Sequence, residues 1–332
     1  MSQFRRDPIT GRWIIVDITE PKTPETFELH PQTKKGGVCP FCPGNEHMTP
    51  PEIEAIRHGN SAPNTPGWMV RVVSNKFPAL RIEGNLDRRG IGVYDMCNGV
   101  GAHEVIIETP DHYKDLADLS QGEIRNVIFK FRSRSLDLEK DARFRYILIF
   151  KNHGAQAGAS LEHTHTQLVA LPIVPKRVQE ELKGAEIYFN YKERCVFCDM
   201  IAQEQEDKIR IVSENQNFIA FCPFVPRFAF ETWILPKMHD QHFKSIDDRR
   251  VDDMAGILKD VLVRIKKVLN DPPYNFIIHT APIRDGRNEE FHWHLEIMPK
   301  LVSVAGFEWG SGFYINPTAP EVAAKYLKDA GI

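Results

Sequence analysis

The amino-acid sequence predicts an α+β fold of two tandem units, each an antiparallel sheet with a covering helix. The first observation is a repeat, because both halves of the 332 residues carry the same signals in the same order. Each half has a Cys-x-x-Cys pair, a strand that ends shortly before a histidine, a helix, a strand, and a strand that opens with His-x-His. The second is the alternation of β-branched runs with amphipathic stretches. We therefore divide the chain into an N-terminal half, residues 1–175, and a C-terminal half, residues 193–332.

The covering helices have recognisable starts. The "SQGE" of residues 120–123 is a capping box, and "IRNVIFKFRSRSLDL" follows with apolar residues at helical spacing. The "SIDD" of residues 245–248 precedes a second amphipathic run, "MAGILKDVLVRIKKVL". Between the halves, prolines end a strand in "LPIVPKRVQEELKGAEIYF", and a polar helix leads to the second cysteine pair.

Composition narrows the classes of function. The formal net charge is −3, and no basic stripe is present, which argues against a nucleic-acid partner. No apolar run approaches the ~20 residues that span a bilayer, and charged residues interrupt the start of the chain too early for a signal peptide. We therefore expect a cytoplasmic protein with no membrane partner.

Four of the six cysteines form two pairs, "CPFC" and "CVFC". In a reducing compartment such pairs are typical of metal sites or redox centres. Zinc prefers four thiolate or imidazole ligands in a tetrahedron, and histidines from other strands can complete each pair. We expect two structural zinc ions per chain. The predicted ligands are Cys39, Cys42, His112 and His163 in the first half, and Cys195, Cys198, His239 and His292 in the second. A redox role for the pairs, and His242 in place of His239, remain alternatives.

The stretch "GASLEHTHTQLVAL" contains His-x-His-x-Gln, and residues i, i+2 and i+4 of a strand share one face. If His163 binds zinc, the ring of His165 beside it is free to act as a nucleophile, because neutral imidazole attacks phosphorus well near pH 7. Gln167 can donate an N–H to a phosphate oxygen as charge builds. The preceding "GAQAGAS" offers backbone N–H groups to an anion. The alternative is that His165 is a core histidine.

The second half has "HWHLE" in the same place, with Glu296 where the first half has Gln167. A carboxylate repels a phosphate, and no Gly-Ala-Ser turn precedes this strand. The second half is therefore predicted to bind a metal ion but to have no catalytic activity, with His294 structural or an auxiliary metal ligand.

These motifs give the chain a resemblance to a known family. "RRDPITGRWIIV", "CPFCPGN", "AHEVIIETPDH", "FKNHGAQAGASLEHTHTQ", "CVFC", "ILPKMH" and "HWHLEIMP" together resemble the galactose-1-phosphate uridylyltransferase family of the histidine-triad superfamily, in the bacterial branch near the ADP-glucose phosphorylases. The resemblance implies two histidine-triad-like halves, a homodimer, and ping-pong transfer of a nucleotidyl group through His165, with Gln167 stabilising it. The implied donor is UDP-glucose and the implied acceptor a hexose 1-phosphate. The implied substrate-binding residues are Asn75, Lys76, Asn152, Gly158, Ala159, Ser160 and Gln167.

The sequence also departs from the family pattern. Glu20 and Thr23 occupy positions where many members have phosphate-binding arginines, and Leu161 and Glu162 replace an Asn-Pro pair before His163. The donor base and the acceptor therefore stay open. An ADP-sugar phosphorylase and a non-catalytic, zinc-stabilised nucleotide-binding protein are the alternatives to a uridylyltransferase.

Overall fold

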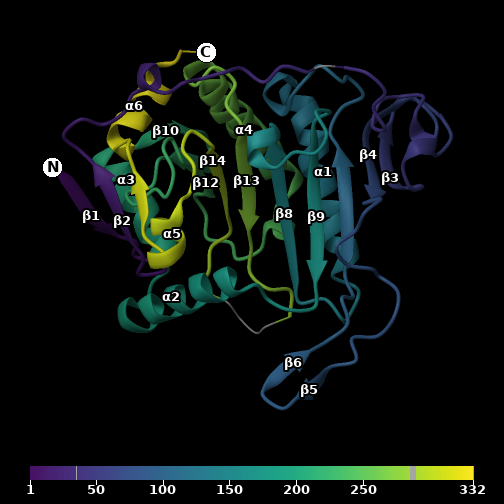
Figure 1. Cartoon of the computed structure of the whole chain (residues 1–332), viewed down its shortest axis with the longest axis horizontal. Helices are drawn as coiled ribbons and strands as arrows, with labels where there is room; N and C mark the ends of the chain where they lie inside the picture. Colours follow the sequence, from purple (N-terminus) through teal and green to yellow (C-terminus); the bar gives the residue numbers. More distant parts are fainter. Residues whose placement is uncertain (35, 285–288, 332) are drawn as a thin grey trace.

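The computed structural model describes residues 1–34, 36–284 and 289–331. Its main feature is one ten-stranded antiparallel sheet that runs through both halves of the chain (Figure 1). From its centre outwards, the first half contributes β8 (Tyr146–His153), β9 (His165–Leu171), β7 (Ala102–Ile107), β4 (Trp68–Ser74) and β3 (Glu52–Arg57). The second half contributes β13 (Tyr274–His279), β14 (His294–Pro299), β12 (Thr232–Pro236), β11 (Phe218–Phe221) and β10 (Ile211–Glu214).

The two halves repeat the same strand order on either side of the centre. β8 and β13 join them by antiparallel pairing, with Tyr274 opposite His153 and Ile278 opposite Ile149. Each half is thus a five-stranded antiparallel unit in which the His-x-His strand is second from the centre. The predicted α+β class with two similar units is confirmed. The division at residues 175 and 193 stays a prediction, since the sheet is continuous across it.

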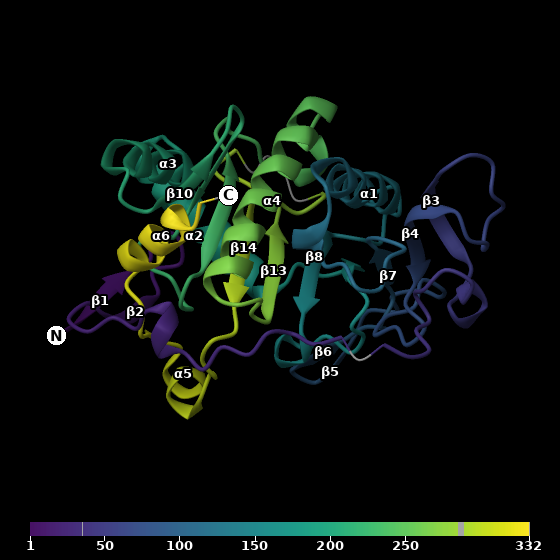
Figure 2. The same ribbon diagram turned by 90° about the horizontal axis from the view of Figure 1, so that it is seen from above.

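Helices lie on both faces of the sheet (Figure 2). α1 (Gln121–Leu138) and α4 (Asp248–Val268) pack side by side on one face and bury the main apolar core against both halves. On the opposite face, α3 (Val196–Asp207) covers the second half. α2 (Lys176–Lys192) packs on the second half and also on one end of β8 and β9, where its apolar side chains meet Tyr146, Leu148 and Leu171. Near the other end of β9, the described residues that line the cavity at His165 come from none of the α-helices, which leaves space for a site.

The helix starts follow the predicted signals. Ser120 caps α1: its hydroxyl accepts from the Glu123 backbone N–H at 3.3 Å, and its own N–H donates to the Glu123 carboxylate at 2.7 Å. Asp247 caps α4 by accepting from the Arg250 backbone N–H at 2.8 Å. The polar helix between the halves is α2, which Figure 1 shows across one end of the sheet. All three predicted helices are confirmed.

Smaller elements lie outside the main sheet, most of them near the two ends of the chain. β1 (Ser2–Arg6), β2 (Trp13–Asp17) and β15 (Tyr314–Asn316) form a three-stranded sheet, and β5 (Arg89–Ile91) and β6 (Tyr94–Met96) form a projecting hairpin. α5 (Gly306–Ser311) and α6 (Pro320–Asp329) follow near the C-terminus. The loop before β2 lies so close to α2 that a Cβ on Gly184 would be 1.7 Å from the Ile9 carbonyl oxygen. Among the described residues, no helix combines the length and apolarity needed to cross a membrane.

Candidate functional site

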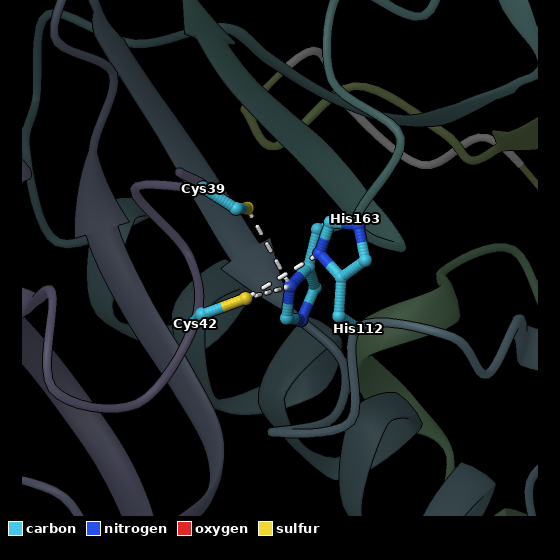
Figure 3. A group of neighbouring side chains, drawn as sticks. All are labelled: Cys39, Cys42, His112 and His163. Carbon is cyan, nitrogen blue, oxygen red and sulfur yellow. Dashed lines mark hydrogen bonds between the residues drawn. The ribbon is translucent and has the colours of Figure 1, made fainter. Parts of the chain in front are cut away.

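The four predicted metal ligands of the first half lie together (Figure 3). Cys39 and Cys42 come from a turn before β3, His112 from the loop after β7, and His163 from the residues just before β9. One ligand atom of each lies within 4.8 Å of the others. The Nδ1 of His163 is 3.7 Å from the Cys39 sulfur and 3.6 Å from the Cys42 sulfur, and the Nδ1 of His112 is 3.4 Å from the Cys42 sulfur.

These distances suit a shared ion better than direct contacts. A tetrahedral zinc with bonds of 2.3 Å to sulfur and 2.0–2.1 Å to nitrogen puts sulfur and nitrogen about 3.5 Å apart. The His163 Nε2 lies 2.7 Å from the Thr109 carbonyl oxygen, to which it donates, so the lone pair is on Nδ1. Burial lowers the pKa of His163 to about 4, which keeps the ring neutral. The group therefore could hold a metal ion of the zinc type.

The second half repeats this arrangement. Cys195 is the N-cap of α3 and Cys198 lies in its first turn. The Cys198 sulfur is 3.4 Å from the Nδ1 of His239 and 3.5 Å from that of His292. The His292 Nε2 donates to the Pro236 carbonyl at 2.9 Å, as His163 does to Thr109. This group, too, could bind a metal, and its fourth member is His239 rather than His242.

A cavity of about 360 Å³ lies beside the first metal group, and His165 lines it. The Nδ1–H of His165 donates to the His163 carbonyl at 2.8 Å, which leaves the lone pair of the neutral ring on Nε2. Burial lowers the pKa of His165 below its usual range, and the positive charge of Lys151 lowers it further. The ring is therefore a neutral imidazole at the wall of a cavity, which is the state required of a nucleophile.

Gln167, Asn75, Lys76 and Ser160 line the same cavity. The Nδ1 of His103, on β7, accepts from the Ala79 N–H at 3.4 Å, so its Nε2–H donates to the Gln167 Oε1 at 2.8 Å and fixes that amide. The Asn75 Nδ2 lies 3.0 Å from the same Nε2. Sequence reasoning assigned no role to His103. Alternation along "AHEVI" could have placed it on the face of His165, since β7 pairs with β9.

The turn of residues 154–160 is placed by both halves of the chain. The Asn152 amide donates to the Gly158 carbonyl at 3.3 Å, and the amide of Asn275, on β13, donates to Asn152 and to the Ala157 carbonyl, both at 2.8 Å. The N–H groups of Gly158 and Ala159 bond inside the turn, at 3.0 and 3.2 Å. Of the predicted binding residues, Asn152 and Gly158 thus shape the turn, while Ser160 reaches the cavity. Asn275 was missed because its partners are over 100 residues away.

The equivalent face of the second half is closed. His294 makes the same bond as His165, from its Nδ1 to the His292 carbonyl at 3.1 Å. Its ring, however, is buried, stacked on Trp233 and His279 with centroids 5.1 and 4.7 Å away, and tilted against Phe197 of α3 at 5.0 Å. Burial and the charge of His279 lower the pKa of His294 to about 4. Among the described residues, the cavity that His294 lines measures about 20 Å³, which is too small for a nucleotide sugar.

Glu296 belongs to a buried ion-pair network on that closed face. Arg227 bonds Glu296, and His279 lies 2.9 Å from Glu181 and 3.2 Å from Glu296. Burial opposes ionisation of Glu296, but Arg227 and His279 hold its pKa well below the usual range. Burial alone would lower the pKa of His279, but Glu181 and Glu296 raise it to about 10. The carboxylates are thus neutralised by side chains of the protein itself, and this cluster explains why the last position of "HWHLE" is Glu.

Comparison with known proteins places the chain in a family. The family described as galactose-1-phosphate uridyl transferase, N-terminal domain, matches residues 1–175, and a domain of unknown function matches residues 96–329. An ADP-glucose phosphorylase from Arabidopsis thaliana is 37% identical over 99% of this chain and 93% of its own length. The chain belongs to the galactose-1-phosphate uridylyltransferase family. The resemblance inferred from the motifs is therefore confirmed.

Further relatives of this family show the same extent of similarity. A galactose-1-phosphate uridylyltransferase from Thermotoga maritima is 28% identical over 100% of this chain and 99% of its own length. The crystal structure of an ADP-glucose phosphorylase from Arabidopsis thaliana with bound ADP-glucose superposes with a TM-score of 0.84, 36% identity and complete coverage of both chains. A structure of a uridylyltransferase gives 0.77 and 30%, covering 99% of this chain and 98% of that one. This family member is thus an enzyme of the nucleotidyltransferase and phosphorylase type.

Proposed function

We propose that the chain transfers the nucleotidyl group of a nucleotide sugar to a phosphate-bearing acceptor through a covalent intermediate on His165. One observation carries the proposal: His165 lines a cavity with its Nδ1–H committed to the His163 carbonyl at 2.8 Å, so that Nε2 holds the lone pair. A neutral, fixed imidazole beside an amide donor is the arrangement needed for attack on phosphorus.

In the first step the Nε2 lone pair attacks the α-phosphorus of the donor. The bond from that phosphorus to the bridging oxygen breaks, and a sugar 1-phosphate leaves with the electron pair. The Nδ1–H bond to the His163 carbonyl stabilises the positive charge that the ring acquires. Gln167, fixed by His103 at 2.8 Å, donates to a non-bridging oxygen. In the second step an acceptor phosphate oxygen attacks, the N–P bond breaks, and His165 recovers its lone pair.

The two Cys₂His₂ groups would hold zinc, which supplies structural cross-links between distant segments. In the first half this cross-link ties the turn of Cys39 and Cys42 to His163, and so to the peptide that receives the His165 Nδ1–H bond. Phe41, which lies between the two cysteines and contacts the His165 ring, is thereby held in the cavity wall.

For the donor we propose ADP-glucose, with inorganic phosphate as acceptor, which gives ADP and glucose 1-phosphate. The 37% identity over nearly the whole chain with an ADP-glucose phosphorylase supports this better than it supports the uridylyltransferase expected from the motifs. Glu20 and Thr23 also support this choice of substrates, since neither brings the positive charge with which arginine would bind a sugar phosphate. UDP-glucose with galactose 1-phosphate stays the second candidate.

The test is a labelling experiment without acceptor. The protein is mixed with ADP-glucose or UDP-glucose labelled at the α-phosphorus, and covalent label is measured after denaturation in base. We expect ADP-glucose to label His165 faster, and inorganic phosphate to discharge the label as ADP. Faster labelling by UDP-glucose, with discharge by galactose 1-phosphate, would establish the uridylyltransferase. Absence of label from both donors would support the non-catalytic alternative.

Two expectations from the sequence remain predictions. The homodimer is tested by light scattering on the purified protein, and the cytoplasmic location by fractionation of the cells that express it.

A further inference from the structure

A fully buried polar cluster lies behind His165, on the sheet face opposite to the cavity. The Lys151 Nζ is 2.7 Å from Glu108, 2.8 Å from the Thr164 hydroxyl and 3.0 Å from the His165 carbonyl oxygen. Thr164 and Thr166 each donate a hydroxyl to Glu108 at 2.5 Å. All four side chains are at least 96% buried. Sequence reasoning assigned no role to any of them.

A buried ion pair of this kind is weak evidence for a role in stability. Removing two charges from water costs several kcal/mol per ion, and a well-packed apolar set of similar volume is often as stable or more stable. Burial opposes ionisation of Glu108, yet Lys151 and the two hydroxyls hold its pKa below the usual range, so the pair is charged.

The second half provides an internal comparison. Gln167 lies opposite Phe150 on β8 and Val105 on β7, and its counterpart Glu296 lies opposite Ile277 on β13 and Trp233 on β12. Counting along the strands from these pairs gives the equivalents of Glu108, Lys151, Thr164 and Thr166. They are Pro236, Ile278, Trp293 and Leu295, all apolar and all buried. The same sheet therefore folds with an apolar set where no cavity and no free imidazole need support.

We propose that the Glu108–Lys151–Thr164–Thr166 cluster is a positioning device for the nucleophile, an inference that rests on the proposed role of His165. The cluster holds Thr164 and Thr166, on either side of His165, and the His165 carbonyl itself. The Thr164 carbonyl also accepts from the Glu108 backbone N–H at 3.3 Å. Because the peptide is planar, fixing Thr164 also fixes the preceding His163 carbonyl, which orients the ring of His165.

The main test removes the cluster without leaving a lone buried charge. The variant carries E108L, K151M, T164V and T166V, which replace the set by apolar side chains of similar volume. A matched control, E204L with R210M, removes another buried ion pair, 3.0 Å long and in the second half. The wild type must first be labelled at His165, and if no donor labels it the proposed function fails, independently of this proposal.

With labelling established, we expect the quadruple variant to fold and to bind nucleotide as tightly as the wild type. Its single-turnover rate of label formation should fall about 10- to 100-fold, because small displacements of a reacting group have effects of this size. The control should keep its rate. The ¹⁵N resonance of the His165 Nδ1 should also move in the quadruple variant, a readout that needs no turnover. A rate within threefold of the wild type together with an unmoved resonance would overturn the proposal.

If the quadruple variant does not fold, single changes at Thr166 decide the matter, because they leave both charges in place. T166V removes one bond to Glu108, and we expect a several-fold slower label formation at unchanged nucleotide affinity. T166S keeps the hydroxyl and should restore the rate. Equal rates for T166V and the wild type would contradict a positioning role.

Discussion

Replacing each of the two equivalent histidines by alanine should separate activity from stability. His165 and His294 occupy the same place in their halves and make the same bond, to the carbonyl two residues earlier. The first borders a cavity, whereas the second is enclosed. We therefore expect His165→Ala to abolish transfer with little loss of stability, and His294→Ala to lower stability with little loss of transfer.

The structure gives the size of each effect. The His294 ring packs on Trp233, His279 and Phe197, so its loss resembles a buried aromatic truncation and should cost about 3 kcal/mol. The unfolding entropy of a chain of 332 residues is about 0.7 kcal/mol/K, so the melting temperature should fall by roughly 4 °C. The His165 ring contacts the Phe41 ring and already borders open space, so its loss costs about 1 kcal/mol, mainly for one hydrogen bond. Without its nucleophile, the rate should fall on the order of 10⁴-fold or more.

The assay combines single-turnover labelling with thermal unfolding and nucleotide titration. His165→Ala should still bind the nucleotide sugar, because Gln167 keeps its bond to His103 and Asn75 still lines the cavity. His294→Ala should label at a rate within about threefold of the wild type, measured well below its melting temperature. Equal loss of transfer in both variants would refute the asymmetry between the halves.

Three further predictions concern the metal groups, the intermediate and the ion-pair network. Elemental analysis should find about two zinc ions per chain, and one in Cys39→Ser and in Cys195→Ser; only the former should slow transfer, so equal rates would contradict the coupling through His163. Label on His165 should survive base and be lost in acid, as a phosphoramidate would be, whereas an acid-stable label would point to another nucleophile. The pKa of His279 is raised from 6.5 to about 10, so its contribution to stability is complete below about pH 6.5 and is lost as the pH rises through 10. The urea midpoint should fall over this interval, and fall less in His279→Gln; identical curves would exclude His279 as the cause.

The elements and the metal groups could be predicted from the sequence because their signals are local or repeated. The capping box at Ser120 fixes the start of α1 by itself, and the order of Cys-x-x-Cys, His and His-x-His occurs twice. Cysteine and histidine that recur in the same order in both halves favour metal binding over other roles of these residues. The repeat thus turned two weak motifs into two predicted sites, and the structure places the eight side chains in two groups of four, each of which could hold a metal ion.

The supports of the site could not be predicted in the same way. His103 fixes Gln167 across a strand pair, and Asn275 fixes the turn of residue 158 from the other half of the chain. Lys151 in "FKNHG" has the sequence pattern of an exposed strand end, but it is buried against Glu108. Such contacts depend on strand register and on which helix covers which face, and neither is encoded by a short motif.

The covering of the sheet, rather than the His-x-His motif, distinguishes the cavity at His165 from the close packing around His294. Both halves hold a Cys₂His₂ group, the same His-x-His strand and the same bond from a histidine Nδ1 to the backbone. In the second half α2 and α3 pack over the face of the sheet that carries His294. Gly184, which has no side chain, allows the backbone of Ile9 to pack directly against α2. Arg227 balances the charge of the buried Glu296 carboxylate, so Glu296 has a structural role. In the first half α2 packs on Leu148 and Leu171 but does not contribute to the described lining of the cavity at His165. The same strand therefore presents a neutral imidazole to this cavity, and its polar support lies on the opposite face of the sheet.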